Sequence, residues 1–175
     1  MNLILLSILG AIWGTSFLFI KIIVTEVPPL TLVTGRTCLS ALVLWLLILI
    51  RKTPVPKDVK IWRALAVVGL LNGALPYTLI SWGEQYIPSG LAALLQATTP
   101  IFTILAAHVF TLDDRISLKK GAGVILGFAG VGLLMMPELQ RGNLAPTWGM
   151  LAIVGSSISY ALASIYARQH LRGQP

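Results

Sequence analysis

Residues 9–21 read LGAIWGTSFLFIK and form the centre of an apolar run from Asn2 to Val24. A bilayer core of about 30 Å needs about 20 helical residues, so this run is long enough to cross a membrane. It has no basic start and no small-residue cleavage site, so we expect a retained first span, not a signal peptide. The run also contains a cation, hydroxyls and glycines, which are costly in lipid unless they face a partner or a cavity.

The composition of the whole chain is that of a membrane protein. Of its 175 residues, 56% are hydrophobic and 11% are charged, whereas soluble domains carry about 25% charged residues. The net charge of +7 would suit nucleic acid only on a solvated basic face, so these apolar runs argue against nucleic-acid binding. The expected surroundings are a lipid bilayer.

Six apolar segments of spanning length are separated by charged or proline-containing breaks, such as Pro28-Pro29 and residues 51–60, RKTPVPKDVK. They predict an all-α polytopic membrane protein with six transmembrane helices. The predicted spans are Asn2 to Val24, Leu30 to Ile50, Trp62 to Trp82, Gly90 to Phe110, Lys120 to Met136 and Trp148 to Ala167.

The basic residues of the predicted loops set the orientation, because Lys and Arg are retained on the cytoplasmic side. One set of loops holds ten of them and the opposite set holds only Arg141. We therefore expect a multi-pass protein of the bacterial inner membrane with a cytoplasmic N-terminus. The ten are Arg51, Lys52, Lys57, Lys60, Arg63, Arg115, Lys119, Lys120, Arg168 and Arg172.

Small residues at GxxxG spacing in three spans predict close helix packing, because lipid-embedded helices associate through close backbone approach. These glycines are Gly10 with Gly14, Gly69 with Gly73, and Gly123 with Gly127.

Polar and aromatic residues recur at helical spacing on four spans. On the fourth span, Pro100 removes a backbone donor and frees a carbonyl one turn earlier. Such faces suit either an interhelical hydrogen-bond network or a cavity for a small polar or amphipathic solute, and transporters build sites from interrupted helices near the midplane. The candidates for a solute pathway are Trp13, Ser16, Lys21, Arg36, Asn72, Gln96, Thr99, Pro100 and Tyr160.

Lys21 and Arg36 lie at similar depth near the outer ends of their predicted spans. One interpretation is that they snorkel to the interface or pair with Glu26 or Glu84. The other is an electropositive collar that attracts anionic or carboxylate-bearing solutes.

Motifs for catalysis or metal binding are not found, so we expect no enzyme activity, no catalytic residues, no metal and no cofactor. No carboxylate lies in the middle of a span, and His108 lies near a span end, which leaves coupling open. The pair Asp113-Asp114 is a weak Mg²⁺ motif in a cytoplasmic loop, best read as a solvated turn. Cys38 has no partner cysteine and is read as a packing residue.

A faint internal repeat appears at an offset of 147, where Trp13 aligns with Tyr160 and Lys21 with Arg168. The repeat unit would contain five spans, an odd number, so the second copy would enter the membrane inverted.

These segments resemble the EamA family of the drug/metabolite transporter superfamily. The resemblance rests on LGAIWGTSFLFIK, PPLTLVTGR, SGLAALLQATTPIFTILAAHVF, the turn DDR, and GAGVILGFAGVGLLMM. Asp114 stands where the family more usually has Glu before Arg. Trp13, Lys21, Arg36 and Pro100 match the family's pattern by position.

The resemblance implies a ten-helix carrier of two inverted halves around a central cavity, often exporting amino acids, metabolites or drugs. It divides the chain into a five-helix repeat over 1–137, an extracytoplasmic linker over 138–147, and the first helix of an incomplete second repeat over 148–175. We expect either a truncated piece of a longer carrier, the preferred interpretation, or a short product that forms a homodimer to close the cavity. The alternative functions are a non-transporting subunit or inactive fragment and, more remotely, a membrane enzyme using the Asp113-Asp114 turn.

Overall fold

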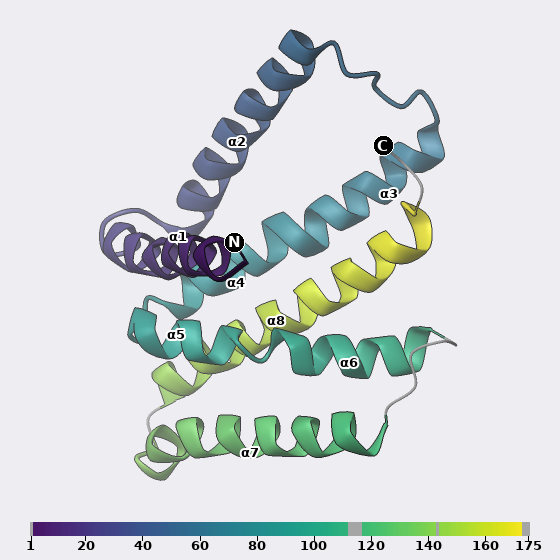
Figure 1. Ribbon diagram of the computed structural model, residues 1–175. Helices are drawn as coiled ribbons and strands as arrows, with labels where there is room; N and C mark the ends of the chain where they lie inside the picture. The colour runs from purple at the N-terminus through teal and green to yellow at the C-terminus, as the bar shows by residue number, and fades with distance from the viewer. Residues whose placement is uncertain (1, 112–116, 143, 173–175) are drawn as a thin grey trace.

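The computed structural model describes residues 2–111, 117–142 and 144–172, and this part of the chain is helical and contains no strand (Figure 1). The predicted Asp113-Asp114 turn lies outside these residues. The helices are α1 Asn2–Ile23, α2 Pro29–Arg51, α3 Val59–Gly69, α4 Leu75–Gly83, α5 Ser89–Gln96, α6 Thr99–Phe110, α7 Leu118–Gln140 and α8 Leu144–His170, with a π-helical turn Leu70–Ala74 between α3 and α4.

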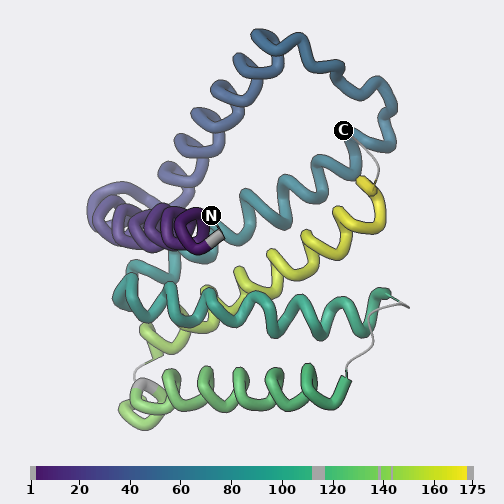
Figure 2. Tube along the Cα trace, in the orientation of Figure 1, coloured from purple at the N-terminus to yellow at the C-terminus, as the bar shows by residue number. Residues whose placement is uncertain are grey.

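Six stretches of the described chain are helical, long and apolar enough to cross a membrane, which confirms the predicted all-α fold. Helices α1, α2, α7 and α8 each supply one span. Helices α3 and α4 together form the third span, and α5 and α6 form the fourth. Figure 2 shows the trace passing through each pair as one interrupted helix.

Local sequence signals explain where several helices begin. Pro29 is the first residue of α2, a position where a missing N–H removes no intrahelical bond. The side chain of Asp58 accepts a hydrogen bond from the backbone N–H of Lys60, and the hydroxyl of Ser117 accepts one from Lys120. These caps start α3 and α7 a few residues before the predicted spans.

Helix α8 is the central helix of the bundle. Figure 1 shows it between α3 and α4 on one side and α6 on the other. Half of its most apolar stretch is buried, compared with 6% in α2 and in α7. Met150 and Ile153 of α8 pack into a core cluster with Ile80, Ile87 and Leu95. The resemblance predicts that this helix begins a second repeat. In the structure its side chains form part of one core with those of the earlier spans.

Helices α4 and α8 cross at two glycines, Gly83 and Gly149. A Cβ at Gly83 would lie 2.7 Å from the backbone oxygen of Gly149, and a Cβ at Gly149 would lie 2.9 Å from the backbone oxygen of Gly83. Neither position admits a larger residue unless the helices move apart.

The glycines of the GxxxG motifs have different surroundings from one another. A Cβ at Gly127 of α7 would meet the side chain of Ile101 of α6. At the other five positions a Cβ would meet no atom within 4 Å in the described chain, so their packing role stays a prediction. These five are Gly10, Gly14, Gly69, Gly73 and Gly123.

The π-helical turn in the third span has its cause in Pro76. In this register the N–H of Leu75 bonds to the carbonyl of Leu70, so the next donor would reach the carbonyl of Leu71. Proline has no N–H, and the hydroxyl of Ser159 on α8 donates to that Leu71 carbonyl at 2.7 Å instead.

The break between α5 and α6 has a similar cause in Pro100. The missing N–H leaves the carbonyl of Gln96 without its helical partner, as predicted. The hydroxyl of Thr99 donates to this carbonyl at 2.8 Å, and the hydroxyl of Ser157 on α8 approaches it at 3.5 Å. At both interruptions a serine hydroxyl of α8 thus lies near a main-chain carbonyl that proline leaves without its helical donor.

The helices extend into the segment predicted as a linker over 138–147. Helix α7 continues through Pro137 to Gln140, and α8 begins at Leu144. The turn between them includes Gly142, whose φ of 64° is in the left-handed region that glycine favours.

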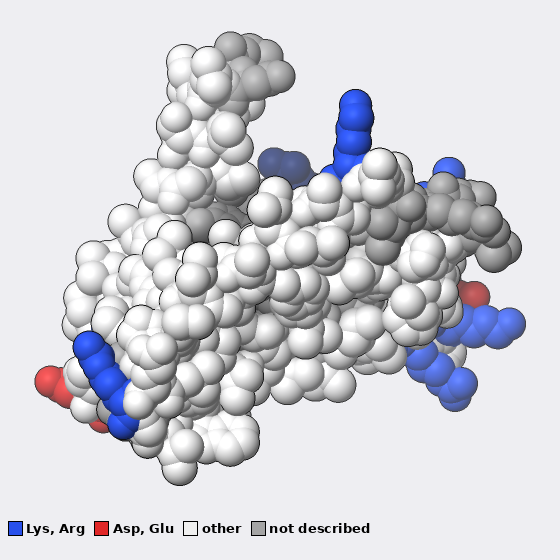
Figure 3. All heavy atoms as spheres, turned by 90° about the horizontal axis from the view of Figure 1, so that it is seen from below, with Lys and Arg blue, Asp and Glu red and all other residues white. Residues whose placement is uncertain are grey.

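Charged side chains are sparse over most of the surface. In Figure 3, a broad part of the visible face carries no Lys, Arg, Asp or Glu between the charged groups at its left and right ends. Many large apolar side chains of α1 and α2 are exposed, among them Leu3, Leu6, Leu42 and Leu49. This distribution suits a surface in contact with hydrocarbon.

Candidate functional site

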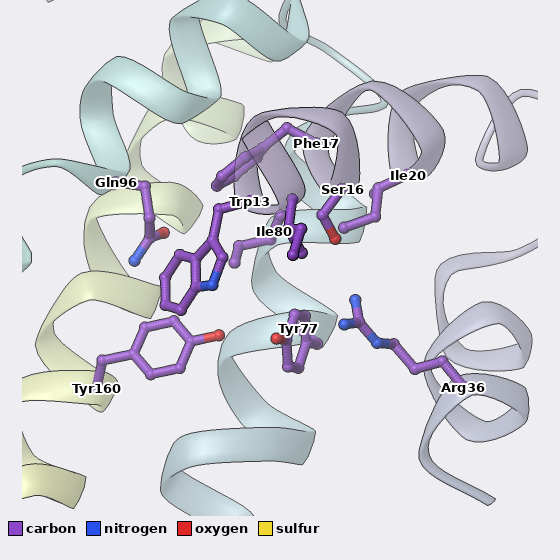
Figure 4. Close-up of a pocket in the computed structure, with 10 residues that line it drawn as sticks. Trp13, Ser16, Phe17, Ile20, Arg36, Tyr77, Ile80, Gln96 and Tyr160 are labelled. Atoms are coloured by element: carbon purple, nitrogen blue, oxygen red, sulfur yellow. The ribbon is translucent and has the colours of Figure 1, made fainter. Parts of the chain in front are cut away.

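A cavity of about 130 Å³ lies where α1, α2, α4, α5 and α8 meet (Figure 4). Its wall is apolar and aromatic with a few polar groups, the usual chemistry of a small-molecule site. The lining residues are Ile12, Trp13, Ser16, Phe17, Ile20, Arg36, Tyr77, Ile80, Gln96 and Tyr160.

Helix α1 supplies one continuous face of the cavity. Trp13, Ser16 and Ile20 follow one another at intervals of three and four residues, so they project from one side of the helix. The indole of Trp13 and the hydroxyl of Ser16 are both directed inward in Figure 4. Two of the three candidates predicted on the first span, Trp13 and Ser16, therefore line this cavity.

Arg36 of α2 is the charged group of the cavity. Its guanidinium carbon lies 3.7 Å from the centre of the Tyr77 ring on α4, a cation–π contact. Among the described residues the guanidinium contacts this ring and no carboxylate. The cavity thus holds a half-buried positive charge.

Tyr160 of α8 faces Tyr77 across the cavity. Their ring centres are 6.3 Å apart with an interplanar angle of 89°, an edge-to-face arrangement. Figure 4 shows the two hydroxyl groups directed toward each other, with the guanidinium of Arg36 beyond Tyr77. Trp13 and Tyr160, which align at the repeat offset, both line this cavity.

Gln96 connects the cavity to the proline break. Its side-chain oxygen accepts a hydrogen bond from the hydroxyl of Ser156 at 2.6 Å, and its amide nitrogen donates to the hydroxyl of Thr99 at 3.0 Å. Gln96 therefore lies in a hydrogen-bond network and also lines the cavity.

A second hollow, of about 530 Å³, adjoins the first and shares Trp13, Phe17, Gln96 and Tyr160 with it. Its other lining residues include two of the predicted candidates, Thr99 and Pro100, and the glycines of α1, Gly10 and Gly14.

Lys21 and Asn72 do not line either hollow. The ammonium group of Lys21 donates to the backbone carbonyl of Glu84, at the end of α4. It thus contacts Glu84, one of the two predicted partners, through the main chain and not through a salt bridge. Asn72 lies in the π-helical turn and is exposed.

Tyr77 and Ile80 were missed as site residues, although a signal was available. Tyr77, Ile80 and Glu84 are spaced by three and four residues and follow Pro76 within the predicted third span. Tyr77 by itself is an ordinary aromatic residue of a membrane helix. Its importance comes from the contact with Arg36 on another helix, which the sequence does not show.

The described residues contain no group of three His, Cys, Asp or Glu side chains that could hold a metal ion. Cys38 is exposed on α2 and is a free thiol.

Comparisons with known proteins agree with this architecture. Residues 1–136 match the model of the EamA-like transporter family. The chain is 32% identical over 156 residues to YedA of Escherichia coli K12, named an uncharacterized inner membrane transporter, covering 89% of this chain and 49% of YedA. It is 23% identical over 157 residues to YoaV of Bacillus subtilis, named an uncharacterized transporter, covering 90% and 53%.

A third relative, PagO of Salmonella typhimurium, is 24% identical over 161 residues, which cover 91% of this chain and 52% of PagO. No solved structure matches this chain. The chain spans about half the length of these curated relatives. With six apolar helices and a family match over most of its length, this chain is a multi-pass membrane protein that belongs to the EamA-like transporter family.

Proposed function

We propose that this chain forms the solute-binding half of a carrier that moves small organic solutes, such as amino acids, metabolites or drugs, by alternating access. The observation that carries the proposal is the guanidinium of Arg36, held over Tyr77 in an aromatic cavity without a carboxylate partner among the described residues. An anionic group, such as a carboxylate, is the natural partner for this charge.

The walls of the cavity support the same proposal. Two of the spans that line it are interrupted, at Pro76 and at Pro100, which is how carriers expose polar groups near the midplane. The adjoining hollow of about 530 Å³ gives room for an apolar portion of the solute. Carriers of this kind rock one half against the other, and the chain covers about half of its relatives.

The test is counterflow of labelled amino acids and organic acids in proteoliposomes in which the purified chain can pair with a second copy of itself to complete the carrier. Arg36→Met should weaken apparent affinity for anionic solutes roughly ten-fold or more, because a charge-assisted bond is lost. Arg63→Met, which removes an exposed basic residue at the start of the third span, is the matched control and should transport normally. Equal transport by the Arg36 variant and the wild type would contradict the proposal.

The alternative, a non-transporting subunit or inactive fragment, is favoured by the half-length match to the relatives. It predicts that a folded chain binds a solute, seen as thermal stabilisation, and yet shows no counterflow until a second half is added. The partner would then be a second half supplied by a different chain.

A further inference from the structure

The carboxyl group of Glu84 is buried at the end of the third span without a hydrogen-bond partner. Glu84 follows Gly83, the last residue of that span, and its side chain is 0% exposed. Neither Oε1 nor Oε2 has a hydrogen-bonding partner among the residues that the structure describes. A buried carboxylate without hydrogen bonds is expensive, so such a group either binds a proton or meets a cation.

Apolar residues surround this point of the fold. Ile80, one turn before Glu84, and Ile87, just after it, belong to the core cluster with Met150 and Ile153 of α8. The crossing of Gly83 with Gly149 brings the backbone of α8 against the end of α4. The titratable side chains that α4 and α8 place against this cluster are Tyr77 and Tyr160, which are neutral phenols at physiological pH.

The charge that acts on Glu84 comes from Lys21 of α1. The ammonium group donates to the backbone carbonyl of Glu84, so a cation is held beside the carboxyl group without being bonded to it. Burial raises the pKa of Glu84 to about 8, while Lys21 opposes the shift. The carboxyl group is thus poised to exchange a proton with water near neutral to mildly alkaline pH.

We propose that Glu84 is the proton-binding site of this carrier and that Lys21 reports its state to the cavity. The structure has Lys21 on the backbone carbonyl of Glu84, and this is the arrangement that belongs to the protonated carboxyl group. When the proton leaves to water, the carboxylate takes the ammonium group as its partner. Lys21 lies one turn beyond Phe17 on the cavity face of α1, so this exchange pulls on the helix that carries Trp13 and Ser16.

This inference rests on the proposed function, since a proton site in a carrier serves coupling. Its first test needs no solute, so the two can fail separately. Infrared spectra of the full chain in lipid nanodiscs, recorded from pH 5 to pH 10, should show a protonated carboxyl band that is lost with a midpoint near pH 8. Glu84→Gln should remove this band, and Glu26→Gln, at an exposed carboxyl on the adjoining turn, should keep it.

Lys21→Met keeps the carboxyl group and tests the same assignment if Glu84→Gln does not fold. Removing the nearby cation should move the midpoint to higher pH. A band that survives in Glu84→Gln, a chain with no carboxyl group titrating above pH 6, or an unchanged midpoint in Lys21→Met would overturn the proposal.

The link to the cavity is tested with a nitroxide spin label on Ser16→Cys, in a chain whose native thiol is removed by Cys38→Ser. The line shape should change with the same midpoint as the carboxyl band, and it should become independent of pH in Glu84→Gln but not in Glu26→Gln. A line shape that ignores pH while the carboxyl band titrates would overturn the coupling to the cavity.

Discussion

At the scale of single residues, Lys21 and Arg36 have different surroundings in the structure, although the sequence predicts similar positions for both. Arg36 lies over an aromatic ring inside the cavity, and Lys21 lies against a backbone carbonyl at the end of another helix. Both were predicted as pathway residues with one shared role. Both cations contact the third span, Arg36 at Tyr77 and Lys21 at Glu84. The sequence of the first two spans does not contain this information.

The pKa of Glu84 predicts a pH dependence of stability. Its folded value of about 8 is above the ordinary value of 4.5, so the folded chain holds this proton more tightly than the unfolded chain. The resulting stabilisation is complete below about pH 4.5 and is lost as the pH rises to about 8. In the Glu84→Gln variant the free energy of unfolding should fall less between pH 4.5 and pH 8, and at pH 9 it should exceed that of the wild type by a few kcal/mol.

Thermal unfolding in detergent at pH 5, 7 and 9 measures this effect. Glu26→Gln serves as the control and should retain the slope of the wild type, because its side chain is exposed. A Glu84 variant with the same decline as the wild type would show that another group causes it.

At the scale of helices, the crossing of α4 and α8 makes a prediction from Gly83 and Gly149. Ala at either position would place a Cβ under 3 Å from the facing backbone oxygen, so each variant should lose about 1–3 kcal/mol of stability. Gly69→Ala meets no atom within 4 Å and should be neutral or stabilising by up to about 1 kcal/mol, through helix propensity. Equal melting temperatures for all three variants would contradict the crossing.

The π-helical turn predicts a coupling between Pro76 and Ser159. Ser159→Ala should cost about 0.6–1.7 kcal/mol, because the Leu71 carbonyl loses its donor. In a Pro76→Ala background the restored N–H can bond within the helix, so the same serine change should cost less. A double-mutant cycle from thermal unfolding gives this coupling energy, and additive effects would count against it.

The elements also show how far sequence reasoning reaches. The six spans follow from hydropathy, and the carbonyl freed by Pro100 was predicted because proline acts locally. The π-helical turn at Pro76 was not predicted, since its register is stabilised by a serine on a helix far along the chain. For the same reason Tyr77 was missed, whereas five of the predicted candidates line one cavity: Trp13, Ser16, Arg36, Gln96 and Tyr160.

At the scale of the whole molecule, the loop charges predict the orientation in the membrane. With a cytoplasmic N-terminus, a cysteine at Thr53 should be protected from an impermeant thiol reagent in intact cells, and one at Gln85 should react, both in a Cys38→Ser chain. Replacing Arg51, Lys52 and Lys57 with Glu should weaken this pattern. Labelling of the Thr53 position and not the Gln85 position in the native charge background would invert the topology.

The central place of α8 has a consequence for biosynthesis. The ribosome releases α3 and α4 well before α8, so the carbonyl of Leu71 lies in the membrane without the serine hydroxyl that bonds to it until α8 is made. Until then the third span presents this carbonyl to lipid or to the insertion machinery, whereas the Gln96 carbonyl of the fourth span already has Thr99 as its donor. Assembly of the first five spans is therefore completed only by the arrival of the sixth, and a pause in translation before Leu144 would leave a membrane intermediate exposed to quality control.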